Sequence, residues 1–206
     1  MLDDERNDVY LHVDARAVEL FNQFKDFQLK KGKLIILKNR IAVHWGDLSQ
    51  VEVEYRLFET ALNNGPYTYY HLLSGVDLPI KTQDYIHEFF QQYAGKEFIG
   101  FWNEPSHRKD VYRKVYRYYL FTQYFKEGSS FVHGITAFTR NVFLGIQKLT
   151  KFKRKHDWDN FYKGFTWVSI TNDFCHYLVD KKTYIMKTFR YTLIPQHYYK
   201  IFFLST

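Results

Sequence analysis

The most informative segment of the chain reads Tyr69-Tyr70-His71-Leu72-Leu73-Ser74-Gly75-Val76-Asp77-Leu78-Pro79. Residues 68–73 are rich in aromatic and aliphatic side chains and therefore predict a buried strand. The strand runs into a Ser-Gly-x-Asp turn, which places Ser74 and the Asp77 carboxylate at its carboxyl end. Open α/β sheets bind their ligands at that edge. Asp77 has a second interpretation, because aspartate in a turn often hydrogen-bonds nearby backbone amides.

Strands and helices alternate on both sides of this segment. Further strands are predicted at residues 9–13, 34–37, 41–45, 97–102 and 164–170. Helices are predicted at residues 17–27, 49–62, 82–93 and 141–156, and from residue 171. The helix at 49–62 would bury the stripe Val51, Tyr55, Phe58 and Leu62, and Thr82 can cap the helix at 82–93. The alternation predicts an α/β fold with a mostly parallel central sheet flanked by helices. There is no linker or internal repeat, so a single domain over residues 1–206 is expected.

The composition indicates a folded and basic protein. Hydrophobic residues make up 46% and charged residues 25% of the 206 positions, which argues against disorder. The 29 Lys and Arg residues outnumber the 22 Asp and Glu residues, so the formal charge is +7. A positive excess suits an anionic partner: a nucleic acid, a phosphorylated sugar donor or an acidic membrane surface.

Cysteine content and hydropathy bear on the compartment. Cys175 is the single cysteine, so no intramolecular disulfide forms and a reducing compartment is expected. No apolar run approaches the roughly 18 residues of a membrane-spanning helix. The acidic, polar N-terminus does not resemble a signal peptide. We therefore expect a cytoplasmic protein, and peripheral contact with the inner face of the membrane stays open.

Two further strand ends carry candidate ligand-binding side chains. His12 and Asp14 are two residues apart, so they face the same side if the strand continues through them. Asp14 could accept hydrogen bonds from a nucleobase or a ribose, or it could cap the following helix. His-x-Asp is also half of a metal site, but no third ligand follows. Trp45 beside Gly46 could stack on a planar base, although a tryptophan is more often a core residue.

Three segments of the second half are open to several interpretations. The basic, tyrosine-rich residues 106–126 could bind single-stranded nucleic acid, hold a sugar acceptor, or form an amphipathic helix with extended basic side chains. The aromatic strand at 164–170 could offer Trp167 as a platform for a sugar, or it could be a core strand. Asp157 and Asp159 resemble the metal-binding pair of nucleotide-sugar transferases, but they follow a polar stretch and we expect a solvated turn there.

Taken in order, four segments resemble the core-2/I-branching β-1,6-N-acetylglucosaminyltransferases and the related peptide O-xylosyltransferases. The segments are residues 3–14, 45–51, 69–80 and 164–170. The third is the most specific of the four. The resemblance covers almost the whole chain and is strongest to the bacterial members. The eukaryotic members have disulfides and a membrane anchor. This chain departs from them in its single cysteine, Cys175, and its polar N-terminus.

The resemblance implies a GT-A-like nucleotide-sugar transferase fold. The family inverts the anomeric centre without a metal, moving a sugar such as N-acetylglucosamine or xylose from a UDP-sugar donor to a glycan acceptor hydroxyl. For this chain it implies polysaccharide biosynthesis, with no cofactor and no nucleic-acid partner. The positions implied for the donor are His12, Asp14, Arg16, Trp45, Gly46, Ser74 and Asp77. Those implied for the acceptor are Glu104, Arg108, Gly164 and Trp167.

The catalytic end departs from the family pattern. The family's general base is a glutamate in a Pro-Asp-Glu segment, whereas this chain has Pro195-Gln196-His197. His197 is therefore the candidate base, since an imidazole can take a proton from a hydroxyl. The basic residues that follow the base in the family, and its first strand, have no counterpart here. We expect a gene fragment, truncated at both ends, with little or no activity alone.

Two other functions compete with this hypothesis. A catalytically dead relative would hold a UDP-sugar or a glycan without transferring the sugar. A basic nucleic-acid-binding protein would bind oligonucleotides with a strong dependence on salt. If UDP competes with a bound oligonucleotide, that result favours the transferase over the nucleic-acid-binding protein.

Overall fold

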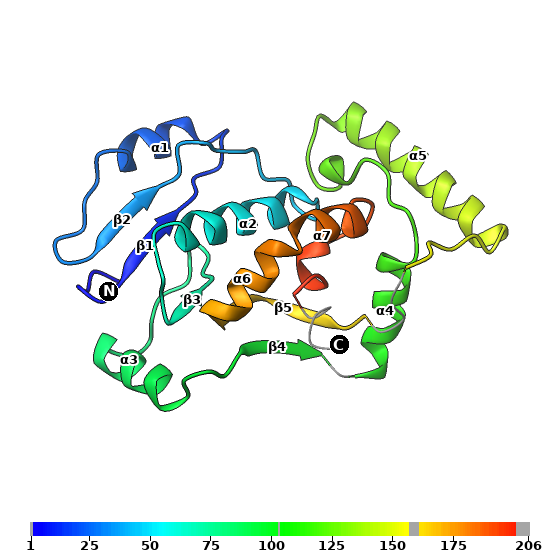
Figure 1. Ribbon diagram of the computed structural model, residues 1–206. Helices are drawn as coiled ribbons and strands as arrows, with labels where there is room; N and C mark the ends of the chain where they lie inside the picture. The colour runs from blue at the N-terminus through cyan, green and yellow to red at the C-terminus, as the bar shows by residue number, and fades with distance from the viewer. Residues whose placement is uncertain (1, 103, 157–160, 201–206) are drawn as a thin grey trace. The chain divides into compact units, whose positions relative to one another are not determined.

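The computed structural model describes residues 2–102, 104–156 and 161–200, and the chain forms two compact units. Unit 1 consists of the residues up to Ala42, Val53–Phe98 and Trp167–Val179. Unit 2 consists of Val43–Glu52, Ile99–Thr166 and the residues from Asp180 onward. Helices and short strands alternate along the chain (Figure 1), which confirms the α/β class at this level of detail.

Unit 1 contains a parallel pair of strands. β1 (Asp8–Leu11) pairs with β2 (Lys33–Ile36), and Asp8 lies opposite Lys33. The connection between the two strands carries α1 (Val18–Phe24), as Figure 1 shows. Parallel strands need such a crossover. The elements expected at residues 9–13, 17–27 and 34–37 are thus present; β1 and α1 are shorter than expected, and β2 has the expected length but begins one residue earlier.

The second sheet has the strand order β3-β5-β4. Its strands are β3 (Tyr69–His71), β5 (Lys163–Thr171) and β4 (Phe98–Trp102). β3 runs antiparallel to β5, with Tyr70 opposite Ile170. Both of these side chains are buried, and burying them on one face fixes the register of the pair.

In the described residues, these two small sheets take the place of the one mostly parallel central sheet that was predicted. The alternation of strands and helices indicated the fold class but not the direction of β3 against β5, because pairing partners far apart in the chain set that direction. Residues 41–45 also lack the predicted strand. The Ile41 amide donates to His12 Nε2 and the Ile41 carbonyl accepts from the Ala15 amide, so loop contacts satisfy this backbone.

The helices α2 (Ser49–Leu62) and α3 (Gln83–Gln92) begin where the sequence predicted. α2 buries Val51, Tyr55 and Phe58, three of the four residues of its expected inner stripe, and Leu62 is half-buried. The Thr82 hydroxyl caps α3 by accepting from the Tyr85 amide (3.3 Å). Apolar spacing was therefore sufficient to locate both helices, and the Thr82 cap additionally marks the start of α3.

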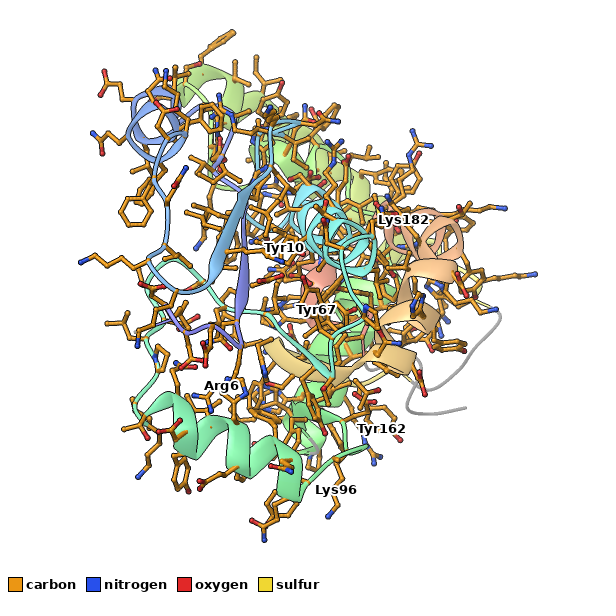
Figure 2. The ribbon with its side chains drawn as sticks, turned by 60° about the vertical axis from the view of Figure 1, so that its left-hand side comes forward. Arg6, Tyr10, Tyr67, Lys96, Tyr162 and Lys182 are labelled. Atoms are coloured by element: carbon orange, nitrogen blue, oxygen red, sulfur yellow. The ribbon has the colours of Figure 1, made fainter. Side chains whose placement is uncertain are left out.

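A hydrogen-bonded pair of tyrosines connects β1 with the segment before β3. The Tyr67 hydroxyl donates to the Asp8 carboxylate (2.5 Å) and is bonded to the Tyr10 hydroxyl (2.7 Å). Figure 2 shows the two tyrosines near each other. Burial, together with the Asp8 contact, raises the pKa of Tyr67, so its hydroxyl keeps its proton and remains a donor.

Unit 2 is mainly helical. Its helices are α4 (Pro105–Val115), α5 (Ser130–Leu149), α7 (Lys182–Phe189) and the short 3-10 turns η1 (Thr122–Tyr124) and η2 (Pro195–His197). A buried cluster in this unit contains Tyr119, Leu193 and Ile194, against which Phe125 and Leu144 pack.

Two helix predictions in the second half had different outcomes. α6 (Asn172–Asp180) follows β5 directly, as predicted. The helix predicted at 141–156 begins earlier, at Ser130, and ends at Leu149, because Lys151 takes a left-handed conformation (φ 55°) that stops the helix. Across the described ranges, no helix has both the length and the apolarity needed to cross a bilayer.

Candidate functional site

The first predicted donor group lies just beyond β1 in unit 1. The strand ends at Leu11, so His12 and Asp14 follow it in an irregular segment and strand alternation does not orient them. The Asp14 carboxylate accepts from the Arg16 Nε (3.0 Å), the Arg16 Nη2 (2.9 Å) and the Arg16 amide (2.8 Å). These bonds hold a carboxylate at the carboxyl end of a parallel strand, where α/β proteins bind ligands.

His12 is held as a neutral imidazole beside this carboxylate. Its Nε2 accepts from the Ile41 amide (3.1 Å), which leaves the ring proton on Nδ1. Burial lowers the pKa of His12, Asp14 opposes that effect, and the charges of Arg56 and Arg40 add to it. The group therefore offers a ligand hydrogen-bonding partners suited to hydroxyl and amide groups.

The same Asp-x-Arg arrangement occurs at Asp4 and Arg6. The Asp4 carboxylate accepts from the Arg6 Nε (2.7 Å) and Nη2 (2.9 Å), and Arg6 also contacts Asp84 (2.7 Å). Arg6 is labelled in Figure 2. Asp4 precedes β1 whereas Asp14 follows it, so only Asp14 lies at the strand's carboxyl end. The two motifs form a matched pair for experiments.

The second donor group, Ser74 and Asp77, forms a self-contained turn. Asp77 Oδ2 accepts from the Ser74 amide (2.6 Å), and the Asp77 amide donates to the Ser74 carbonyl (3.2 Å). Hydrogen bonds from Ser74 hold the pKa of Asp77 below its ordinary value, so the carboxylate is charged at neutral pH. Val76 and Leu78 beside it are exposed. This geometry matches the simple turn interpretation, and a contact with a donor sugar stays a prediction.

Trp45 and Gly46 belong to unit 2. The Phe125 ring stacks on the Trp45 ring with centroids 5.6 Å apart, and Lys126 Nζ lies 3.6 Å from the indole centroid. Gly46 has a φ of 78°, a left-handed conformation that favours glycine, and its carbonyl accepts from the Ile194 amide (2.9 Å). The indole keeps 38% of its exposure, so stacking on a base would compete with these neighbours.

The predicted acceptor residues fall in two places. Glu104 and Arg108 line a cavity of about 10 Å³ near the start of α4, which is room for about one water and not for a sugar. Trp102, also in its lining, packs against His107 with ring centroids 5.0 Å apart. Trp167 lies on the exposed side of β5 and keeps 45% of its exposure, so its ring is open to a ligand.

His197 and Gly164 are brought together in unit 2. The His197 Nδ1–H donates to the Gly164 carbonyl (2.9 Å), which leaves Nε2 as a proton acceptor. Burial lowers the pKa of His197, the bond to Gly164 opposes this, and Lys163, Lys114 and Lys200 lower it further. The imidazole is therefore neutral at neutral pH, which is the form that a general base requires.

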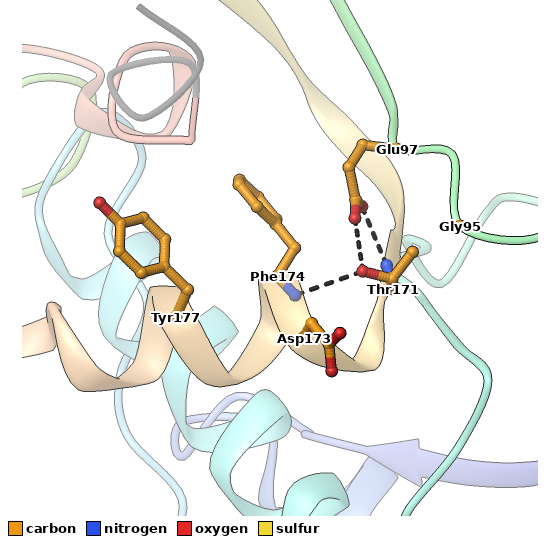
Figure 3. Close-up of a pocket in the computed structure, with 6 residues that line it drawn as sticks. All are labelled: Gly95, Glu97, Thr171, Asp173, Phe174 and Tyr177. Atoms are coloured by element: carbon orange, nitrogen blue, oxygen red, sulfur yellow. Dashed lines mark hydrogen bonds between the residues drawn. The ribbon is translucent and has the colours of Figure 1, made fainter. Parts of the chain in front are cut away.

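The sequence did not anticipate a pocket of about 410 Å³ in unit 1, shown in Figure 3. Its lining residues are Gly95, Glu97, Thr171, Asp173, Phe174 and Tyr177. The Glu97 carboxylate accepts from the Thr171 amide (2.9 Å) and from the Thr171 hydroxyl, which accepts in turn from the Phe174 amide (3.2 Å). These bonds connect the end of β5 with the first turn of α6.

The chemistry of this pocket differs from that of a diphosphate site. Glu97 and Asp173 are carboxylates, and no Lys or Arg is among the lining residues. Negative side chains would repel a diphosphate. The rings of Phe174 and Tyr177, with centroids 6.3 Å apart, offer apolar surface, and the volume lies within the roughly 300–1,000 Å³ of small-molecule sites. The sequence signalled Asp173 through its place after a strand, whereas folding alone brings Glu97 to it.

The described residues hold no cluster of three or more His, Cys, Asp and Glu side chains that would suit a metal ion. Asp157 and Asp159, the pair that the sequence analysis assigned to a solvated turn, lie outside the described residues. The predicted site residues thus gather into small groups: His12 with Asp14 and Arg16, Ser74 with Asp77, Trp45 with Gly46, Glu104 with Arg108, and Gly164 with His197.

These groups are the candidate ligand-binding side chains of an α/β protein. The family profile described as "Branch: Core-2/I-Branching enzyme" matches residues 1–206. The chain therefore belongs to the Core-2/I-branching enzyme family, a family of glycosyltransferases, as the resemblance predicted.

Two relatives agree with this class. The chain is similar to Xylosyltransferase oxt of Drosophila melanogaster, with 23% identity over 193 residues, covering 90% of this chain and 20% of the relative. It is also similar to Xylosyltransferase 1 of Canis lupus familiaris, with 28% identity over 108 residues, covering 52% of this chain and 11% of the relative. The chain thus spans a fifth or less of the length of these relatives.

Proposed function

We propose that the chain is a glycosyltransferase domain that moves a sugar from a nucleotide-sugar donor to a hydroxyl group of a glycan acceptor. The family match over residues 1–206 is the observation that carries this proposal. The names of the relatives favour xylose as the sugar, and N-acetylglucosamine is the alternative from the family as a whole. We further propose inversion at the anomeric centre without a metal, and a cytoplasmic role in polysaccharide biosynthesis.

The donor would bind at the carboxyl end of β1. Asp14 would accept from the uridine, and its three hydrogen bonds to Arg16 support this role because they hold the carboxylate in one orientation. Arg16, whose side chain is half exposed, would be available to the negative diphosphate. Asp77 would contact the donor sugar, and Trp45 would stack on the base.

In the chemical step a base removes the proton of the acceptor hydroxyl while the hydroxyl oxygen forms a bond to C1 of the sugar. The bond between C1 and the diphosphate oxygen breaks, and UDP leaves with the electron pair. The His197 ring is suited to the role of the base, because its Nδ1 proton is held by Gly164 and its Nε2 is free of a proton. Trp167 would support the acceptor sugar with its exposed ring. Glu104 and Arg108 would contact a more distant part of the acceptor. The pocket around Glu97 would take a neutral sugar, not the diphosphate.

Calorimetric titration with UDP tests the donor half of the proposal. The wild-type chain should bind UDP, and Asp14→Asn should weaken binding about tenfold or more, because a charged acceptor of a hydrogen bond is lost. Asp4→Asn is the matched control, since it breaks the same type of bond to an arginine on the other side of β1, and it should bind UDP like the wild type. Equal losses in the two variants, or no binding of UDP, would contradict the donor assignment.

Turnover of UDP-xylose and UDP-N-acetylglucosamine with a glycan acceptor tests the transfer itself. Any transfer should disappear in His197→Gln and should decline as the pH falls through the lowered pKa of His197, below the ordinary imidazole value of 6.5. UDP binding without transfer would support a module that only holds the donor. Salt-sensitive oligonucleotide binding that UDP does not displace would support a nucleic-acid-binding protein.

A further inference from the structure

Helix α5 in unit 2 carries its apolar side chains on its exposed face. The large apolar residues on that face are Phe131, Ile135, Phe138, Val142, Ile146 and Leu149. Their spacing of three and four residues puts them on a single stripe that runs the length of the helix. Phe131, Phe138 and Leu149 are 76%, 71% and 85% exposed. In water, a stripe of this kind is normally turned toward a core.

The fully buried side chains of α5 are polar instead, and beside them the partly buried Leu144 packs against the Tyr119/Leu193/Ile194 cluster. Thr136, Arg140 and Gln147 are the buried residues of the helix. The Gln147 side chain donates to the Tyr118 carbonyl (2.9 Å) and accepts from the Tyr118 amide (2.8 Å), so it fixes which side of the helix faces the rest of unit 2. Arg140 lies 5.0 Å from the centroid of the Phe125 ring. Specific polar contacts therefore hold α5 in the orientation that exposes its apolar stripe.

Positive charge continues from the end of this stripe. α5 contains no Asp or Glu, and Lys148 lies in its last turn. Lys151, Lys153 and Lys155 follow within the next residues and are all exposed, as is the Phe152 side chain between them. An exposed apolar stripe that ends in a lysine cluster is typical of helices that lie in the interface of an anionic membrane.

We propose that the apolar stripe of α5 and the adjoining lysines dock on an anionic lipid bilayer, with the helix parallel to the membrane plane. At about 1.5 Å per residue the 20-residue helix is about 30 Å long. Its polar inner face would remain against the protein, so the helix lies on the bilayer without spanning it. A second copy of the chain would complement the stripe but offers the lysines no acidic residue on α5, whereas anionic lipid satisfies both features.

Co-sedimentation with vesicles of phosphatidylcholine and phosphatidylglycerol tests the proposal. The wild-type chain should bind these vesicles, bind pure phosphatidylcholine vesicles less, and lose binding as salt is raised. The double variant Phe131→Ser/Phe138→Ser should lower the partition coefficient at least about tenfold, because two exposed rings no longer enter the lipid. The control Ile80→Ser removes an equally exposed apolar side chain of unit 1 and should bind like the wild type.

The lysines are tested in the same assay. Lys151→Gln/Lys153→Gln/Lys155→Gln should remove most of the preference for anionic vesicles, whereas Lys25→Gln/Lys30→Gln/Lys38→Gln, with the same change in net charge, should keep it. Circular dichroism shows whether each variant retains its helix content. Absence of vesicle binding, or binding that the Phe131/Phe138 variant leaves intact, would overturn the proposal. Concentration-dependent self-association that this variant abolishes, without vesicle binding, would assign the stripe to a second copy instead.

Discussion

Helices α2 and α5 both carry apolar residues at helical spacing, but they orient them in opposite ways. α2 buries Val51, Tyr55 and Phe58 almost completely. α5 exposes its apolar stripe and buries Thr136, Arg140 and Gln147. Periodicity therefore identifies a helix with an apolar face, but the partners available in the fold decide whether that face is turned inward.

Truncating one phenylalanine on each helix gives the largest contrast. Phe58→Ala should lower the free energy of unfolding by about 3–5 kcal/mol, because it leaves a cavity in a packed core. Phe138→Ala removes the same atoms from an exposed position and should change the free energy of unfolding by no more than about 0.5 kcal/mol. Denaturant unfolding followed by fluorescence measures both. Similar losses in the two variants would mean that the α5 stripe is covered.

The polar inner face of α5 can be tested at Gln147. Gln147→Ala should cost about 1–3 kcal/mol, because it leaves the partly buried amide and carbonyl of Tyr118 without their side-chain partner. Gln91→Ala on the exposed side of α3 is the control and should cost no more than about 0.5 kcal/mol. Equal stability of the two variants would show that Gln147 does not hold α5 in place.

A smaller effect is expected from pH at His71, an exposed residue whose imidazole lies among aromatic rings of unit 1. The imidazole lies against Phe90 (4.5 Å between centroids) and Tyr69 (6.0 Å), and this burial lowers its pKa from 6.5 to about 4. Below pH 6.5 the unfolded chain takes up a proton that the folded chain refuses, so stability should fall between pH 6.5 and 4 and no further below that range.

We expect this loss to be at most about 1 kcal/mol, because part of His71 is exposed and solvent screens the charge. The measurement is the free energy of unfolding across that pH range for the wild type and for His71→Gln. The difference between the two proteins should change with pH by this amount. A difference that is constant with pH would show that the ring environment does not alter the titration of His71.

The sequence located most elements, but it erred where distant residues decide the outcome. The Thr82 cap and the stripe of α2 were recognisable because both act within a few residues along the chain. The strand predicted at 41–45 is absent, since the Ile41 amide finds its partner in the side chain of His12. The start of α5 was missed because its glycines, threonines and polar residues gave only a weak signal.

The candidate site shows the same division. The sequence indicated Asp14, Asp77 and His197, and the family membership agrees with the resemblance on which those residues were chosen. The roles of Asp14, Asp77 and Trp45 in binding the donor stay predictions, as does a single domain over the whole chain. The bond between His197 and Gly164 and the pocket around Glu97 could not be predicted, because each joins residues that only the fold brings together.

The sequence by itself determined the α/β class, the family, and the places where α2 and α3 begin, because caps, apolar spacing and short motifs act over neighbouring residues. Only the tertiary structure decided the antiparallel pairing of β3 with β5 and the exposure of the α5 apolar stripe to solvent. Both depend on contacts between side chains and backbone groups far apart in the chain, such as Tyr70 with Ile170 and Gln147 with Tyr118. A one-dimensional pattern does not contain these pairings.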